Sequence, residues 1–146
     1  MIMVDTNLLV YARCSDFPQH PIARDWLDNL ISNGPRVALP WSSLVGFMRI
    51  VTNPRILRQP ESIHDAWKQV TAWLQPATVW IPTPTDRHSE VLAPLLPHTA
   101  GRPNLIPDAD LAALAIEHGL TLCSADGDFA RFPGLRWVNP LLSPQP

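Results

Sequence analysis

The stretch that decides the fold is Met1-Ile2-Met3-Val4-Asp5-Thr6-Asn7, a short apolar run that ends on an acid. Consecutive apolar residues before a polar turn predict a buried strand over residues 2–4. Asp5 then follows the carboxyl end of that strand, and this is the edge at which open parallel sheets bind their ligands. Acids much later in the chain are predicted to reach the same edge.

Strands and helices alternate along the rest of the chain, which predicts an α/β fold with a parallel sheet covered on both faces. Further strands are predicted over 37–39, 78–81, 120–123 and 135–138, and helices over 8–12, 21–33, 41–52, 62–74, 86–96 and 108–118, with a loop over 98–106. A chain of 146 residues is long enough for one domain with its own core. We expect a single domain over residues 1–142 and a flexible tail over 143–146.

Composition narrows the classes of function. Hydrophobic residues make up 46% of the chain, which is too many for a disordered protein, and the net charge of −2 gives no global basic field for nucleic acid. Locally, however, no acid occurs from Asn29 to Pro60, a segment that holds Arg49 and Arg55. Two cysteines make no disulfide framework, and we expect no signal peptide, no membrane span and a cytoplasmic location.

Two more acidic groups are predicted to meet Asp5. Asp108 opens a helix in Pro107-Asp108-Ala109-Asp110, and Asp126 follows a strand in Ser124-Ala125-Asp126-Gly127-Asp128-Phe129. If the first and fourth strands are neighbours, Asp5, Asp108 and Asp126 converge on one rim. Converging carboxylates repel one another unless a hard cation such as Mg²⁺ joins them, directly or through water, at separations of roughly 4–8 Å.

Each acid also has a purely local interpretation. Asp5 could form an Asx-turn, Asp108 could be an ordinary helix cap, and Asp126 and Asp128 could be turn residues around Gly127. Asp110 is expected to face away from Asp108 and to be solvated. The hydroxyl groups of Thr6 and Ser124 could hold a carboxylate or cap the backbone. The five histidines show no paired spacing and are interpreted as surface residues.

Taken together and in order, these motifs resemble the PIN-domain nucleases and, more narrowly, the VapC toxins of bacterial toxin–antitoxin pairs. The resemblance rests on Val4-Asp5-Thr6-Asn7, Asp108-x-x-Leu-Ala-Ala-Leu-Ala, Thr121-Leu122-Cys123-Ser124-Ala125-Asp126-x-Asp128-Phe129 and the run from Arg131 to Trp137. It implies a PIN-like three-layer sandwich with strand order 3-2-1-4-5. It also implies a Mg²⁺- or Mn²⁺-dependent endoribonuclease that forms a homodimer and is neutralised by a VapB-type antitoxin.

The resemblance assigns roles residue by residue. By that carry-over Asp5, Asp108 and Asp126 bind the metal, Asp128 belongs to the catalytic group, and Asn7 helps to orient the site. Structured RNA is the expected substrate. Because the acid-free segment follows the second strand toward the same rim, Arg49 and Arg55 are expected to contact it.

The chain departs from the family pattern at Gly46, where a glutamate is usual in a run like Glu-Phe-Leu-Arg. The departure leaves open whether one or two metals bind. It also supports the alternative of a PIN-like RNA-binding module with weak or lost turnover. If the missing acid limits the site to one tightly bound metal, Gly46→Glu is expected to tighten Mn²⁺ binding.

Two other enzyme classes fit less well. Haloacid-dehalogenase-like phosphatases need a second aspartate where this chain has Asn7, and dinucleotide-binding proteins need a glycine-rich loop after the first strand. The N-terminal half also carries many large aromatic residues, namely Trp26, Trp41, Phe47, Trp67 and Trp73. We expect part of this set to serve the homodimer and the antitoxin.

Overall fold

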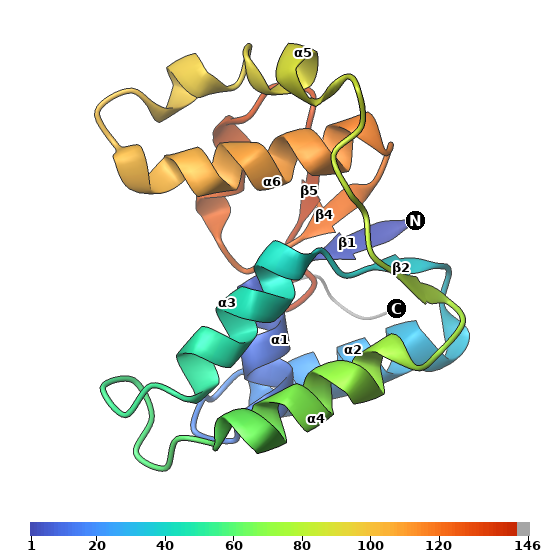
Figure 1. The fold of residues 1–146 in the computed structure, drawn as a ribbon, viewed down its shortest axis with the longest axis vertical. Helices are drawn as coiled ribbons and strands as arrows, with labels where there is room; N and C mark the ends of the chain where they lie inside the picture. Colours follow the sequence, from blue (N-terminus) through green and yellow to red (C-terminus); the bar gives the residue numbers. More distant parts are fainter. Residues whose placement is uncertain (143–146) are drawn as a thin grey trace.

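The computed structural model describes residues 1–142 (Figure 1). The strands are β1 (Ile2–Val4), β2 (Val37–Ala38), β3 (Val79–Trp80), β4 (Thr121–Cys123) and β5 (Arg136–Val138). The α-helices are α1 (Thr6–Arg13), α2 (His20–Asn33), α3 (Trp41–Val51), α4 (Ile63–Leu74), α5 (His88–Leu92) and α6 (Ile106–Glu117), and the 3₁₀ helices are η1 (Leu96–Thr99), η2 (Pro103–Leu105) and η3 (Gly127–Arg131). The tail predicted over 143–146 lies outside the described residues.

The strands within residues 1–142 form one sheet in the order β3-β2-β1-β4-β5. Every pairing is parallel, with Ile2 of β1 opposite Val37 of β2 and opposite Thr121 of β4. The α/β class and the strand order are therefore confirmed. Since β1 and β4 are neighbours, their carboxyl ends lie side by side, and the Asp5 amide donates to the Cys123 carbonyl at 3.0 Å.

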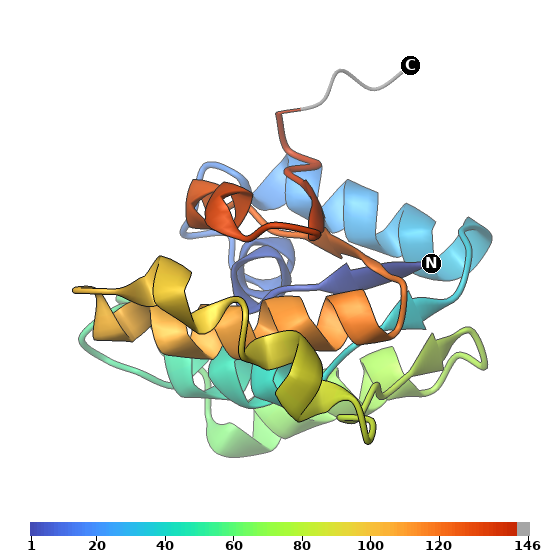
Figure 2. The ribbon, with the colours of Figure 1, turned by 90° about the horizontal axis from the view of Figure 1, so that it is seen from above.

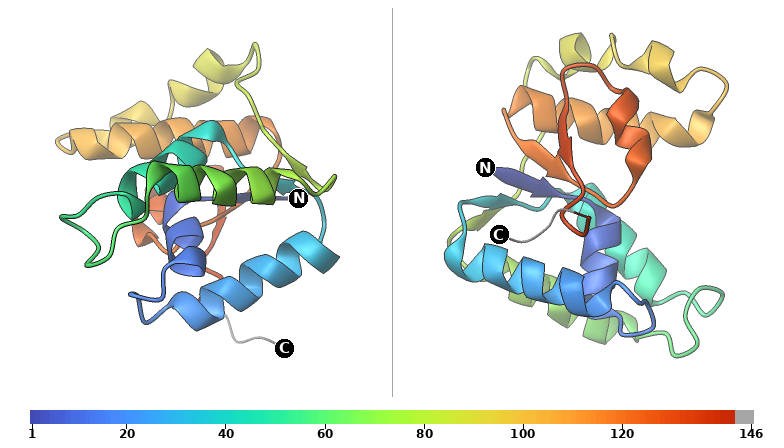
Figure 3. Two further views of the ribbon diagram at one scale, coloured as in Figure 1. Left: turned by 60° about the horizontal axis from the view of Figure 1, so that its bottom comes forward. Right: turned by 180° about the vertical axis from the view of Figure 1, so that it is seen from behind.

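Helices cover both faces of the sheet. Helices α3 to α6 lie on the side that faces the viewer in Figure 1, and α1, α2 and η3 lie behind it, as Figures 2 and 3 show. Met3 and Val4 are both fully buried but belong to different clusters: Val4 packs with residues of α1 to α4, and Met3 with residues of α6 and β4. Met3 and Val4 point to opposite faces of the sheet because side chains alternate along a strand, although the cluster of Val4 also includes residues of α3 and α4.

The structure differs from the sequence prediction mainly around the prolines. The helix predicted over 86–96 is only α5, because Pro94 and Pro97 cannot donate the backbone hydrogen bonds that would extend it. The loop predicted over 98–106 contains the second half of η1 and all of η2, and both carry a proline in their first turn. Helix α6 consequently starts at Ile106, two residues before Asp108.

Helix α1 is longer than its predicted span of 8–12. Asp5 is its N-cap, and the Asp5 side chain accepts a hydrogen bond from the Thr6 amide, so the helix begins directly after β1. No helix within residues 1–142 is long and apolar enough to cross a membrane.

Candidate functional site

A cleft of about 670 Å³ opens at the carboxyl edge of the sheet. It is bordered by the start of α1, by one face of α3 and by the first turns of α6. Three of the predicted acids share it. Its lining residues are Asp5, Thr6, Asn7, Ser42, Ser43, Val45, Gly46, Arg49, Ile50, Pro107, Asp108, Leu111 and Asp126. Segments a hundred residues apart are thus brought to one place, as predicted.

Each of the three acids stands at the N-terminus of a helical element. Asp5 caps α1, Asp108 lies in the first turn of α6, and Asp126 caps η3, where its side chain accepts from the Asp128 amide at 2.9 Å. The local interpretations of Asp5 and Asp126 as turn and cap residues therefore hold as well. Helix starts favour negative charge, so the same positions can carry carboxylates that also face a ligand.

A hydrogen-bond network holds the Asp5 carboxylate in place. Its Oδ1 accepts from the Thr6 amide at 2.8 Å, and its Oδ2 accepts from the Ser124 hydroxyl at 2.7 Å and from the Asn7 amide nitrogen at 3.4 Å. Asn7 also donates to Ser124 at 3.1 Å and accepts from the Ala125 amide at 3.1 Å. Asn7 thus ties the end of β1 to the end of β4.

Burial raises the pKa of the Asp5 carboxyl above its ordinary value, and the hydrogen bonds from Ser124 and Thr6 act in the opposite direction. The pKa of Asp108 is raised to about 6, first by burial and then by the negative charges of Asp126 and Asp5. The negative charges of Asp5 and Asp126 therefore act on Asp108 in the same cleft. A cation placed there would relieve this repulsion.

The donor set fits a hard divalent cation, because carboxylate oxygens are the ligands that Mg²⁺ prefers. Within residues 1–142, however, no group of three or more His, Cys, Asp or Glu side chains is arranged so that all of them could coordinate one metal ion directly. Asp5, Asp108 and Asp126 would then hold the ion partly through water, as Mg²⁺ sites commonly do. The spacing of roughly 4–8 Å expected between these carboxylates remains a prediction.

Asp128 differs from the other acids in its surroundings. It is not among the residues that line the cleft, and both of its carboxylate oxygens meet arginines: Oδ1 lies 2.9 Å from Arg131 and Oδ2 lies 3.2 Å from Arg102. The hydrogen bond from Arg131, together with the charge of Arg102, lowers the pKa of Asp128. Its predicted catalytic role stays a prediction, and in this structure its contacts are with these two arginines.

The two arginines predicted to bind substrate differ in their position relative to the cleft. Arg49 is exposed and lines the cleft with the acids. Arg55 is exposed in the loop that follows α3 and is not among the cleft-lining residues. Arg49 is therefore the better placed of the two to meet a phosphate group that approaches the carboxylates. Asn7 lines the cleft, but its amide group is already engaged with Asp5, Ser124 and Ala125.

Ser124 has a larger part than its sequence suggests. It is fully buried, donates to Asp5, and accepts from Asn7 and from the Asp126 amide at 3.1 Å. Its hydroxyl thus connects two of the three acids. The available signal was its position, one residue beyond the apolar strand and two before Asp126.

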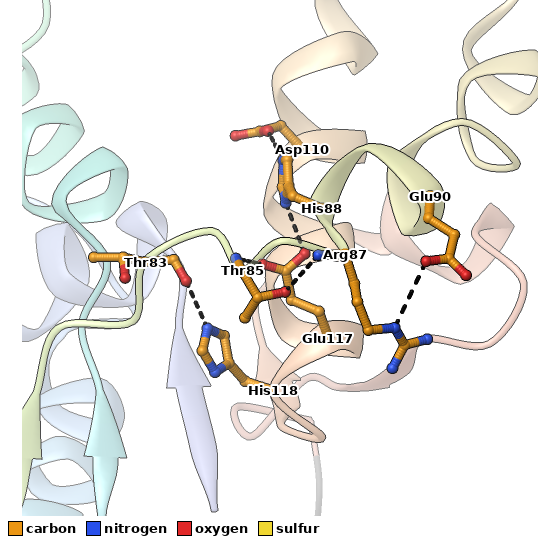
Figure 4. A network of polar contacts seen from close by, with 8 residues as sticks. All are labelled: Thr83, Thr85, Arg87, His88, Glu90, Asp110, Glu117 and His118. Carbon is orange, nitrogen blue, oxygen red and sulfur yellow. Dashed lines mark hydrogen bonds and ion pairs between the residues drawn. The ribbon is translucent and has the colours of Figure 1, made fainter.

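His88 is more than a surface residue. His88 of α5 lies between two acids of α6, with Nδ1 2.7 Å from Glu117 and Nε2 2.7 Å from Asp110 (Figure 4). The Glu117 side chain is fully buried and also accepts from the Thr85 amide at 2.8 Å. Asp110 is 58% exposed, as predicted, but it is paired with His88 rather than only solvated. This network ties α5 to α6 and is separate from the cleft.

Comparison with known proteins identifies the family. The PIN domain family model matches residues 2–135. Ribonuclease VapC43 of Mycobacterium tuberculosis is 41% identical over 141 residues, 97% of this chain and 96% of the relative. Ribonuclease VapC37 of the same organism is 38% identical over 140 residues, 96% and 97% of the two chains.

Solved structures agree on the fold. A toxin–antitoxin complex from Klebsiella pneumoniae contains a chain that superposes with a TM-score of 0.63 at 22% identity, covering 96% of this chain and 98% of that one. The family model spans β1 to β4 and ends one residue before β5, and the two relatives extend over almost the whole length. The chain belongs to the PIN-domain family, among the VapC ribonucleases.

Proposed function

We propose that this protein is a toxin of a type II toxin–antitoxin pair that cleaves structured RNA as a Mg²⁺- or Mn²⁺-dependent endoribonuclease. The observation that carries the proposal is the single cleft that Asp5, Asp108 and Asp126 line together, with the pKa of Asp108 raised to about 6 by burial and by the neighbouring acids. The relatives named as ribonucleases support RNA as the substrate.

In this proposal the three carboxylates hold a divalent cation, which supplies positive charge for the phosphate and makes a water molecule more acidic. Ser124 and Asn7 keep the Asp5 carboxylate turned toward the cleft through their hydrogen bonds. Arg49, which is exposed and lines the same cleft, meets the RNA backbone by its charge. Such backbone contacts carry no sequence information, so they leave the RNA target undefined.

A second candidate is a PIN-like module that binds RNA with weak or lost turnover. Gly46 favours it, because α3 presents no carboxylate to the cleft from the position at which the family usually has glutamate. The two candidates differ in turnover and agree on RNA binding and on the cation.

Incubation of purified protein with total RNA and Mg²⁺ or Mn²⁺ separates the candidates. The nuclease proposal predicts discrete fragments that vanish with EDTA, with Asp5→Asn and with Asp108→Asn. Asp25→Asn, at a 72% exposed side chain on α2, is the matched control and should cleave like the wild type. Intact RNA in every reaction, together with a mobility shift, would favour the binding module instead.

The proposed antitoxin would meet an apolar surface on α3 and α4. We define the α3–α4 patch as Trp41, Val45, Ile63 and Trp67, whose exposed fractions range from 44% to 63%. The rings of Trp41 and Trp67 stack at 6.4 Å between centroids, and the other two members lie one helical turn from them. Val45 also lines the cleft, so a bound chain can run from the patch to the carboxylates.

We therefore propose that a VapB-type antitoxin lays apolar side chains on the α3–α4 patch and a basic side chain into the acidic cleft. Of the other aromatic residues expected to serve association, Phe47 and Trp73 lie in the core and pack on each other at 4.8 Å. Trp67→Ala should weaken antitoxin binding at least tenfold in calorimetry. Ile22→Ala, at a 54% exposed residue of α2, is the control and should leave binding unchanged.

Two further parts of the proposal rest on the family resemblance and on the cysteines. We propose a homodimer, which predicts dimer mass in light scattering at micromolar concentration; monomer mass throughout would contradict it. We also propose a cytoplasmic location, with which the free thiols of Cys14 and Cys123, both buried, are compatible.

A further inference from the structure

Helix α3 passes unusually close to the start of α1. A Cβ atom added at Gly46 would lie 2.6 Å from Thr6 Oγ1 and 3.1 Å from Thr6 Cγ2. Real Cβ atoms almost never come within 3.0 Å of another group, so no other residue fits at Gly46 while Thr6 stays where it is. The Thr6 side chain occupies the space that a side chain at position 46 would need.

Space, rather than backbone geometry, explains the glycine. The glycines of this chain with positive φ are Gly101, Gly119 and Gly134 within the described residues, and Gly46 is not among them. Glycine in the middle of a helix is otherwise unfavourable. The close approach of α1 is what the absent side chain makes possible at this position.

Thr6 also donates two hydrogen bonds, one to α3 and one to Asp5. Thr6 Oγ1 donates to the Ser43 carbonyl of α3 at 3.1 Å, and the Thr6 amide donates to Asp5 Oδ1 at 2.8 Å. One residue therefore links α3 to the carboxylate at the end of β1. Any displacement of Thr6 by a side chain at position 46 is transmitted to Asp5.

We propose that Thr6 and Gly46 form a positioning pair that sets where the Asp5 carboxylate faces the cleft. The pair also determines that α3 contributes no carboxylate, because the space for one is filled by Thr6. The inference rests on the proposed function for the purpose that Asp5 serves, although the steric pairing itself does not depend on it.

The pairing reverses the sequence-based expectation for Gly46→Glu. A glutamate at position 46 displaces Thr6 and disturbs Asp5 before it can offer an oxygen to a cation. Gly46→Glu is now expected to weaken Mn²⁺ binding rather than to tighten it.

A double-mutant cycle of Gly46→Ala and Thr6→Ala tests the pair. With alanine at position 6, the nearest remaining side-chain atom is its Cβ, which lies 3.4 Å from an added Cβ, an ordinary van der Waals contact. Gly46→Ala alone should weaken Mn²⁺ binding at least tenfold in the folded protein. Thr6→Ala alone should weaken it about threefold or less, and adding Gly46→Ala to it should cause no further loss.

A metal-free readout makes the test independent of the nuclease proposal. The ¹H–¹⁵N resonance of the residue 6 amide reports its hydrogen bond to Asp5. Gly46→Ala should shift that resonance when residue 6 is Thr and leave it in place when residue 6 is Ala. Gly127→Ala, whose added Cβ meets nothing within 4 Å, is the matched control and should not shift it.

The outcomes are distinct. A residue 6 amide unmoved by Gly46→Ala overturns the proposal, and so does a double variant that binds Mn²⁺ no better than Gly46→Ala alone. A purely structural role predicts altered unfolding with unchanged amide shift and Mn²⁺ affinity, which also overturns it. A wild type that binds no Mn²⁺ removes the proposed function, while the amide shift still decides whether Thr6 and Gly46 position Asp5.

Discussion

Ser124→Ala is expected to destabilise the protein because it removes hydrogen bonds to Asp5 and Asp126, and not because it loosens the packing of the core. The Ser124 hydroxyl is buried, donates to the Asp5 carboxylate at 2.7 Å, and accepts from Asn7 and from the Asp126 amide, each at 3.1 Å. Without it, the Asp5 Oδ2 atom keeps only the Asn7 contact at 3.4 Å, and the Asp126 amide loses its acceptor. Loss of a hydrogen bond to a buried charged group costs about 1.5–3 kcal/mol.

We therefore expect Ser124→Ala to lower the free energy of unfolding by about 2–3 kcal/mol at pH 7.5 in EDTA. Urea unfolding followed by tryptophan fluorescence measures this directly, and the midpoint should fall by about 1 M. Because the Ser124 hydrogen bond acts to lower the pKa of Asp5, the variant should also bind Mn²⁺ more weakly. Ser42→Ala, at an exposed serine of the same cleft, is the control and should change stability by less than about 0.5 kcal/mol. A loss in Ser124→Ala no larger than in this control would refute the reasoning.

Three further predictions follow from the charges. Since the folded-state pKa of Asp108, about 6, lies above its ordinary value of 3.8, the metal-free protein loses stability as the pH rises toward and through 6. Asp108→Asn should therefore raise the melting temperature by about 2–4 °C at pH 8 in EDTA, with a gain that shrinks toward pH 4.5; an unchanged gain would count against it. Burial acts to lower the pKa of His88, but the hydrogen bonds to Asp110 and Glu117 outweigh burial and raise this pKa. The stabilisation from these hydrogen bonds is therefore present at low pH and is lost as the pH rises through the folded-state pKa of His88. His88→Ala should thus cost about 1–2 kcal/mol at pH 6 and less at pH 9, and an equal cost at both would contradict the pairing. Arg49→Ala should reduce the slope of log affinity for RNA against log salt by about one, whereas Arg55→Ala, outside the cleft, should change it less; equal effects would place both on the RNA path.

The sequence alone could predict the parts of the site that depend on local pattern. An apolar run that ends at Asp5, and another that ends just before Ser124, predict two strands whose carboxyl ends carry acids. A proline followed by Asp108 predicts the start of a helix. Alternation of strands and helices then predicts that these ends share one edge, and the structure confirms that Asp5, Asp108 and Asp126 line one cleft.

The parts that escaped prediction depend on contacts between distant segments. Asp128 is followed three residues later by Arg131, but the approach of Arg102 from 26 residues away is set by tertiary packing. His88 is separated from Glu117 by 29 residues, so no local spacing reveals their pairing. The 3₁₀ turns around Pro97 and Pro103 were missed because the same prolines that end helices also begin short turns.

Gly46 shows the limit of a comparison made residue by residue. Set against the family pattern, it is only a missing acid. The structure adds the physical reason, because Thr6 fills the space and ties α3 to α1. Predicting this contact requires the distance between α1 and α3, which the sequence of neither helix gives by itself.

The most direct test of the central claim is a Mn²⁺ titration of the metal-free protein, followed by electron paramagnetic resonance. The account predicts a saturable site in the wild type that Asp5→Asn, Asp108→Asn and Asp126→Asn each weaken at least tenfold, since even the neighbours of metal ligands contribute about 10–100-fold to affinity. Asp25→Asn should bind as the wild type does. Equal Mn²⁺ affinity in the wild type and in all three cleft variants would contradict the claim that these carboxylates hold the cation.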